Sequence, residues 1–244
     1  MHEVIPGATM QNDHLRAGEA RRPRAGEARR PRAGFTLIEL MVVVGILAVI
    51  AAAAIPTMLG GSDNARLKTA VRELSAAMDL ARSEAIRTGQ IHLVFVGTDA
   101  SGNALPNFNG VPAVVTVVND GIPGSANQNC QIDAGEVVLA MEPRAAVAAG
   151  IMAGVAQMAE DVGTGVIATG STFTDPNGNA ASWVLFRPEG SAHAFDAGCT
   201  IGPLGSGAGG IYLNNGNRQF GYALRPMGNG RVRIWEEGSA AWVN

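Results

Sequence analysis

The sequence predicts an α+β protein in which one long N-terminal helix packs on antiparallel β-sheets. Two observations carry this prediction. An apolar run from Phe35 to Ile55 continues into an amphipathic helical pattern over residues 57–88. Seven short apolar runs then follow, separated by Gly, Asn, Asp and Pro, which is the pattern of strands joined by local turns.

The apolar run holds a single charged residue, Glu39. As a helix it would extend about 32 Å, which is enough to cross the hydrocarbon core of a bilayer. The preceding residues 1–34 are rich in Arg and carry a net charge of +3, so they predict a cytoplasmic N-terminus. Because a carboxylate in lipid is costly without a partner, Glu39 is a candidate functional residue.

The second half of the predicted helix has an apolar stripe with three- and four-residue steps, and its charged residues lie mostly off that stripe. The stripe consists of Leu67, Ala70, Val71, Leu74, Ala77, Met78, Ala81 and Ala85. Gly89 is a stop signal for the helix. Pro56 and Gly60–Gly61 are expected to kink or loosen the junction between the two halves.

The predicted strands are short apolar runs after Gly89. They cover residues 91–96, 113–118, 136–141, 182–187, 210–213, 220–225 and 231–235. Residues 144–170 are rich in Ala and Gly, and their periodicity does not decide between helix and loop.

Two cysteines, Cys130 and Cys199, leave two alternatives open. Their separation fits no metal-binding motif. In an oxidising compartment they would close a loop of about 70 residues, worth about 4 kcal/mol in the loop-entropy model. The alternative is a pair of buried free thiols.

No constellation of residues indicates an enzyme, a cofactor or a metal site. His92 and His193 lie outside any catalytic motif, and we expect them to be surface or strand residues. The glycine-rich run 205–210 lacks the following helix of a phosphate-binding loop, so we expect a flexible connection there. Asp120, Asp133 and Glu136 loosely resemble a calcium loop, but their spacing misses the EF-hand template and a solvated loop is expected.

A basic stretch near the C-terminus is the one candidate nucleic-acid interface. It holds Arg218, Arg225, Arg231 and Arg233 among the aromatic residues Phe220, Tyr222 and Trp235. Arg231 and Arg233 alternate on a predicted strand and therefore share a face, where they could contact phosphates. The alternative is a hairpin with solvated arginines. Residues 35–244 carry a net charge of −6, so any binding of nucleic acid would have to be local.

The segment AGFTLIEL, residues 33–40, resembles the type III signal of type IV prepilins and of type II secretion pseudopilins. The resemblance implies that a prepilin peptidase cuts between Gly34 and Phe35 and that Phe35 is then N-methylated. It also implies that the Glu39 carboxylate pairs with the new α-amine of a neighbouring subunit during assembly. A buried charge persists where such a partner is supplied.

Three further segments resemble the group formed by H-type pseudopilins and FimT-type minor pilins. They are LARSEAIRTGQIHLVFV at 80–96, VVNDGIPGSANQNCQIDAGEVVL at 117–139 and WVLFRPEGSA at 183–192. The resemblance implies a pilin-like α+β arrangement. GRVR at 230–233 is similar to the GRxR motif of FimT-type pilins, which implies DNA binding.

The expected organisation has four parts. Residues 1–34 form a basic leader that is removed, and residues 35–56 form the transmembrane half of the helix. Residues 57–89 form its amphipathic half, and residues 90–244 form a β-rich periplasmic domain. The protein is thereby expected in the bacterial inner membrane as a single-pass precursor of a pilus or pseudopilus subunit.

The sequence is compatible with three functions. The leading one is a minor pseudopilin of a type II secretion pseudopilus, with other subunits and the prepilin peptidase/methyltransferase as partners. The second is a FimT-like minor type IV pilin that binds DNA. The third is a periplasmic enzyme behind an ordinary signal peptide, whose mature chain would start near Ala53 or Ala54 instead of at Phe35.

Overall fold

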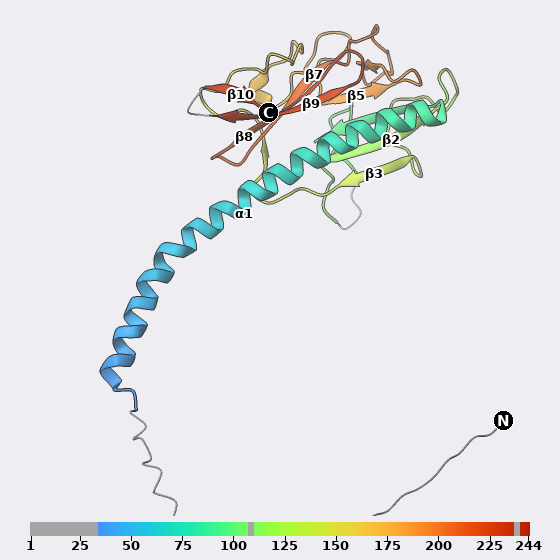
Figure 1. The fold of residues 1–244 in the computed structure, drawn as a ribbon. Coiled ribbons are helices and arrows are strands. Elements are labelled where there is room, and N and C mark those ends of the chain that lie inside the picture. The colour runs from blue at the N-terminus through green and yellow to red at the C-terminus, as the bar shows by residue number, and fades with distance from the viewer. Residues whose placement is uncertain (1–33, 107–109, 237–239) are drawn as a thin grey trace, which may run out of the picture. The chain divides into compact units, whose positions relative to one another are not determined.

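In a computed structural model of the chain, the described residues are 34–106, 110–236 and 240–244, with the backbone alone for residues 53–60. Residues 1–33 of the Arg-rich leader lie outside them. The predicted α+β class is confirmed, because one long helix precedes two antiparallel sheets (Figure 1). The elements are α1 (Leu37–Thr88), β1 (Ile91–Val96), β2 (Val115–Gly121), β3 (Val137–Met141), β4 (Ala148–Ala149), the 3-10 helix η1 (Ile167–Thr169), β5 (Trp183–Phe186), β6 (Ala192–His193), β7 (Gly209–Asn214), β8 (Gln219–Leu224), β9 (Gly230–Glu236) and β10 (Ala241–Val243).

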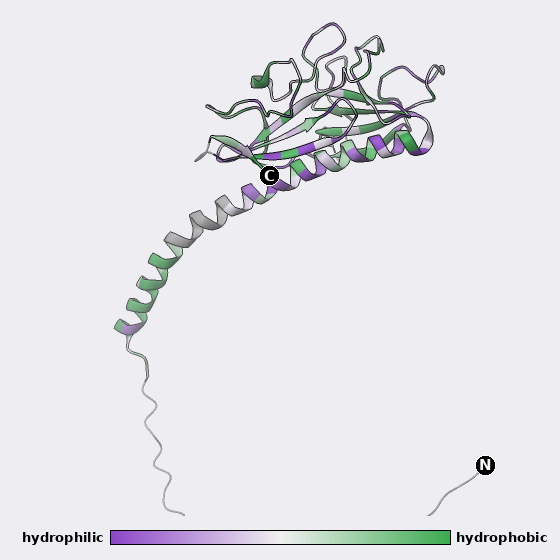
Figure 2. Cartoon of the chain, turned by 45° about the horizontal axis from the view of Figure 1, so that its top comes forward, coloured by the Kyte–Doolittle hydropathy of each residue, from purple (hydrophilic) through white to green (hydrophobic). Residues whose placement is uncertain are grey.

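The chain divides into two units, residues 1–49 and 50–244, and α1 contributes to both. The part of α1 in the first unit is apolar, whereas its C-terminal turns alternate between polar and apolar residues (Figure 2). Over the described residues, no helix combines the length and the apolar character needed to cross a membrane. The helix ends where expected, and Gly89 adopts the left-handed conformation at φ 69°.

The two sheets of the second unit each contain five strands, and all their pairings are antiparallel. The first has the order β3-β2-β1-β5-β6, and the second has the order β10-β9-β8-β7-β4. Each of the seven predicted strands is present within three residues of its expected bounds, and the largest difference is at the end of β2. The Ala- and Gly-rich segment 144–170 is mostly irregular, with only β4 and η1 as regular structure.

The core forms where the C-terminal half of α1 meets both sheets. Leu74, Met78 and Ala81 are buried there. From the first sheet the same cluster includes Val94, Val117, Val184 and Phe186, and from the second it includes Ile211, Tyr222 and Leu224. The predicted apolar stripe of the helix is therefore the face that packs on the sheets.

The opposite face of the first sheet is covered too. Ile91, Leu93 and Phe95 of β1 pack there with Leu185 and Phe195, next to the two cysteines. Both faces of β1 are thus buried, which explains why its sequence is a nearly continuous apolar run and does not alternate with polar residues.

The glycine-rich run 205–210 is not the flexible connection that its composition predicts. Gly207 is buried so closely against β6 that a Cβ atom there would lie 2.5 Å from the backbone nitrogen of His193. Gly209 already belongs to β7, and a Cβ on it would meet the ring of Phe173. The glycines are required because backbone and side chains approach the run at this distance.

A buried carboxylate holds the irregular segment 150–170 against the second sheet. Asp161 accepts hydrogen bonds from the Tyr212 hydroxyl at 2.6 Å and from Thr172 Oγ1 at 2.7 Å. The Gly163 amide donates to it at 2.9 Å, and the Met158 amide donates to the Tyr212 hydroxyl at 3.1 Å. A segment with little regular structure is thereby fixed by side-chain hydrogen bonds to β7.

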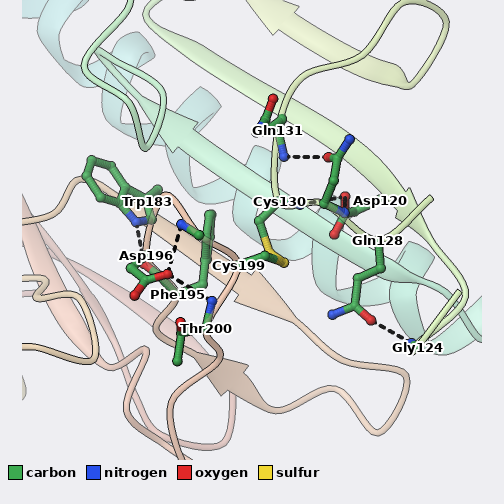
Figure 3. The surroundings of a disulfide bond; sticks show 12 residues. Asp120, Gly124, Gln128, Cys130, Gln131, Trp183, Phe195, Asp196, Cys199 and Thr200 are labelled. Atoms are coloured by element: carbon green, nitrogen blue, oxygen red, sulfur yellow. Dashed lines mark hydrogen bonds between the residues drawn. A yellow bond between two sulfur atoms is a disulfide. The ribbon is translucent and has the colours of Figure 1, made fainter. Parts of the chain in front are cut away.

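Cys130 and Cys199 are joined in a disulfide that links the segment after β2 to the segment after β6 (Figure 3). Asp120, at the end of β2, is fully buried beside it. One oxygen of Asp120 accepts the amides of Asn129 at 3.1 Å and Cys130 at 3.0 Å. The other oxygen has no hydrogen-bond partner within the described residues. Burial raises the pKa of Asp120 from 3.8 to about 6, in spite of these two hydrogen bonds.

Replacing Tyr212 by Phe is expected to lower the free energy of unfolding by about 1–3 kcal/mol, because it removes a donor to Asp161 and leaves the Met158 amide unpaired. Tyr222→Phe is the matched control, since the Tyr222 hydroxyl is also buried but has no partner within the described residues. The control should be neutral or slightly stabilising. Denaturant unfolding measures both, and equal losses in the two variants would contradict this account.

Asp120 is expected to make stability depend on pH. Its pKa is higher in the folded chain than the ordinary value of 3.8, so the folded state binds the extra proton and stability falls as the pH rises from about 4 to about 6. Asp120→Asn keeps an oxygen acceptor but cannot ionise. The variant should be more stable than the wild type by about 1–3 kcal/mol at pH 7.5 and equal to it near pH 4. Unfolding curves of the oxidised proteins at both pH values test this, and a constant difference would contradict it.

Candidate functional site: the start of the long helix and the C-terminal arginines

The predicted cleavage site lies in a non-helical segment just before α1. Gly34 and Phe35 both precede the first helical residue, Leu37, and both are exposed. The Phe35 side chain is 83% exposed. An accessible, non-helical backbone is the form in which a peptidase can bind the peptide bond that it cuts.

Thr36 caps the helix directly after that segment. Its Oγ1 accepts the backbone amide of Glu39 at 3.3 Å, and its carbonyl accepts the amide of Leu40 at 3.2 Å. Thr36 and Glu39 stand in the T-x-x-E spacing of a capping box, a signal that would have identified this cap from the sequence. Glu39 itself is exposed in the first turn, where a negative charge is favourable at the positive end of the helix dipole.

The side chains that follow are apolar around the whole circumference of the helix. Those with large exposed surfaces include Leu37, Ile38, Leu40, Met41, Val42, Val43, Val44, Ile46, Leu47, Val49 and Ile50. No polar face runs along this part, so water is a poor environment for every side of it. Such a helix requires other apolar surfaces around it.

The structure does not bring the four C-terminal arginines together. Arg231 is exposed at the start of β9 and is paired in register with Ala223. Arg225 follows β8 at the same end of the hairpin formed by β8 and β9, whereas Arg218 precedes β8 at the opposite end. At about 3.4 Å per residue along the strand, the two ends are about 17 Å apart.

Arg233 shares a face with Arg231, as the alternation predicts, but it has a structural partner. Its Nε donates to the Glu160 carboxylate at 3.0 Å, and its guanidinium also contacts the side chain of Asn244. This side chain is only 14% exposed. The hydrogen bond from Arg233 lowers the pKa of Glu160. Arg233 thus ties the irregular segment 150–170 and the C-terminus to β9.

The two histidines lie in strands, as expected, and both are buried. His92 is in β1, and burial lowers the pKa of its imidazole. His193 in β6 contacts Ser191 Oγ at 2.9 Å and the Gly202 carbonyl at 3.0 Å. Ser191 and His193 are 2% and 5% exposed, so the pair is screened from solvent. Its hydrogen bonds hold the chain in place between β5 and β7.

Comparison with known proteins identifies one segment. The prokaryotic N-terminal methylation motif matches residues 29–55, which contain the predicted cleavage site, the cap and Glu39. Searches of the curated proteins and of the solved structures found no match. The chain therefore carries a type IV prepilin-like methylation motif, which indicates a pilin or pseudopilin that is processed by prepilin peptidase and assembles with other pilins.

Proposed function

We propose that the chain is an H-type minor pseudopilin, a non-enzymatic structural subunit of a type II secretion pseudopilus that supports protein export. The methylation motif at residues 29–55 carries this proposal, because it combines a peptidase site with an apolar helix and an acidic residue in its first turn. The proposal is narrower than the motif, which is common to pilins and pseudopilins.

The exposed apolar surface of residues 37–50 supports assembly. Before assembly, residues 35–56 would lie in the inner membrane, with the Arg-rich leader on the cytoplasmic side and residues 90–244 in the periplasm. In the fibre, the same surface would pack against the helices of other subunits. The disulfide fits the oxidising environment of the periplasm.

Glu39 would provide register between subunits. In the membrane its carboxylate has a high desolvation cost, and a neighbouring α-amine created by cleavage would offset that cost. Its exposure on the first turn leaves it accessible to such a partner.

The resemblance of three segments to H-type pseudopilins and FimT-type minor pilins supports the choice of this group among the pilins. The segment 80–96, which resembles this group, forms the end of α1 and the whole of β1. The end of α1 in this segment contributes Ala81 and Ala85 to the core that it shares with both sheets. The arrangement of one helix on two antiparallel sheets agrees with what the resemblance implies.

A FimT-like minor pilin that binds DNA is the alternative. Arg231 supports it, because this arginine lies in GRVR and is exposed on a strand. The engagement of Arg233 by Glu160 counts against it, since a buried and paired guanidinium is a poor phosphate ligand. The leading proposal therefore remains the secretion pseudopilin.

Variants of Glu39 test the assembly role. Glu39→Gln and Glu39→Ala are expected to be cleaved after Gly34 and methylated, but to be lost at least about tenfold from the sheared-fibre fraction, because one ion pair in lipid is removed. Thr36→Ala is the matched control, since it removes the cap, worth about 1 kcal/mol, and keeps the charge. Normal incorporation of both Glu39 variants would contradict the pairing. Mass spectrometry of the mature N-terminus completes the test, because a start near Ala53 or Ala54 would instead support an enzyme behind a signal peptide.

Binding of duplex DNA separates the two fibre functions. A mobility shift on the detergent-solubilised chain at about 0.15 M salt is expected to show no binding that depends on Arg231. Arg231→Ala is compared with Arg87→Ala, which removes an equal charge from the exposed end of α1. Micromolar binding that is lost only in Arg231→Ala would favour the DNA-binding pilin.

A further inference from the structure

The disulfide is flanked by the buried carboxylate of Asp120. One oxygen of Asp120 and the sulfur atoms of Cys130 and Cys199 all lie within 4.8 Å of one another. Asp120 is 0% exposed, and one of its oxygens has no hydrogen-bond partner within the described residues. The other oxygen accepts the Cys130 amide, which fixes the carboxylate beside that cysteine (Figure 3).

The two sulfurs differ in access. Cys130 is 1% exposed, whereas Cys199 is partly exposed. Cys199 lies in a tight turn in which Asp196 accepts the amides of Gly198 at 3.0 Å and Thr200 at 2.8 Å. An attacking thiolate can approach a sulfur only along the S–S axis from the exposed side, so the turn presents Cys199 and the core shields Cys130.

We propose that Cys199 is the sulfur attacked in thiol–disulfide exchange and that Asp120 is the acid–base group that gives a proton to Cys130 and takes it back. The partner would be a dithiol–disulfide oxidoreductase that reaches the turn at Cys199. This assignment does not depend on the pilin function, because it uses only the geometry around the disulfide.

In the reductive direction, a partner thiolate forms a bond to Cys199 Sγ and the bond between Cys199 and Cys130 breaks. The electron pair of that bond passes to Cys130, and the protonated Asp120 carboxyl supplies the proton that converts the buried thiolate into a thiol. A second thiolate of the partner then releases Cys199, so the protein disulfide is reduced and the partner dithiol is oxidised.

In the oxidative direction, Cys199 first forms a mixed disulfide with the oxidised partner. The Asp120 carboxylate then takes the proton of the Cys130 thiol, and the resulting thiolate displaces the partner from Cys199. An ionised Asp120 thus favours closure of the disulfide and opposes its opening, because a leaving thiolate next to a buried carboxylate is electrostatically unfavourable.

The surroundings give Asp120 the protonation range that this role requires. Burial raises its pKa to about 6, and the nearby acids Glu136 and Asp133 add to the shift. Asp99 lines a small hollow together with Cys130. Reduction should therefore be faster in the acid range, once the ionisation of the reductant itself is taken into account.

The detergent-solubilised full chain is reduced with dithiothreitol at several pH values from about 5 to about 8, and the rate is measured. Each rate is divided by the rate at which dithiothreitol reduces glutathione disulfide at the same pH. This ratio cancels the ionisation of the reductant. For the wild type it is expected to fall about tenfold across the range, whereas in Asp120→Asn it should stay within about twofold.

Asp133→Asn is the matched control, because it removes a charge from the same loop at a residue that does not contact the sulfurs. In this variant the rate ratio should still fall with pH by nearly as much as in the wild type. An unchanged profile in Asp120→Asn, or an equally flat one in Asp133→Asn, would overturn the assignment. Single-thiol variants identify the attacked sulfur independently. Cys199 in Cys130→Ser should react with an aromatic disulfide reagent at least about tenfold faster than Cys130 in Cys199→Ser, and the reverse order would also overturn it.

Discussion

The packing of the C-terminal half of α1 across both sheets is the contact on which the rest of the described fold depends. Ala77, Ala81 and Ala85 are fully buried, and their small side chains let the helix approach the strands closely. Phe186 of the first sheet and Tyr222 of the second belong to the same core cluster. Because the same core cluster contains residues of the helix and of both sheets, the helix covers apolar surface that each sheet would otherwise expose.

Much of this fold could be predicted from the sequence, because its signals are local. The end of α1 follows from Gly89, and β1 follows from an uninterrupted apolar run. The strands β4, β6 and β10 could not be predicted, since they contain two or three residues and exist only through pairing with longer strands. The prediction of a flexible connection at residues 205–210 is wrong for a related reason, because the close approach of a distant segment cannot be read from composition.

The residues of the candidate site also differ in whether local sequence signals reveal them. Phe35 and Glu39 belong to the contiguous methylation motif, which the sequence alone is sufficient to recognise. The partner of Arg233 is 73 residues away in an irregular segment, so its ion pair could be seen only in three dimensions. The environment of Asp120 is similar, because the charge of this side chain is controlled by burial next to a disulfide whose second cysteine comes from another part of the chain.

The cap on α1 also bears on how the chain matures. Thr36 lies on the C-terminal side of the bond between Gly34 and Phe35, and its hydrogen bonds reach forward to Glu39 and Leu40. Removal of everything up to Gly34 would therefore leave the first turn of the helix intact. If the chain is cut at that bond, the new amine would lie one residue before the cap, next to the positive end of the helix dipole. Maturation would thus add a positive charge at the helix N-terminus, where the helix dipole disfavours it. A carboxylate that pairs with this amine would stabilise it most at that position.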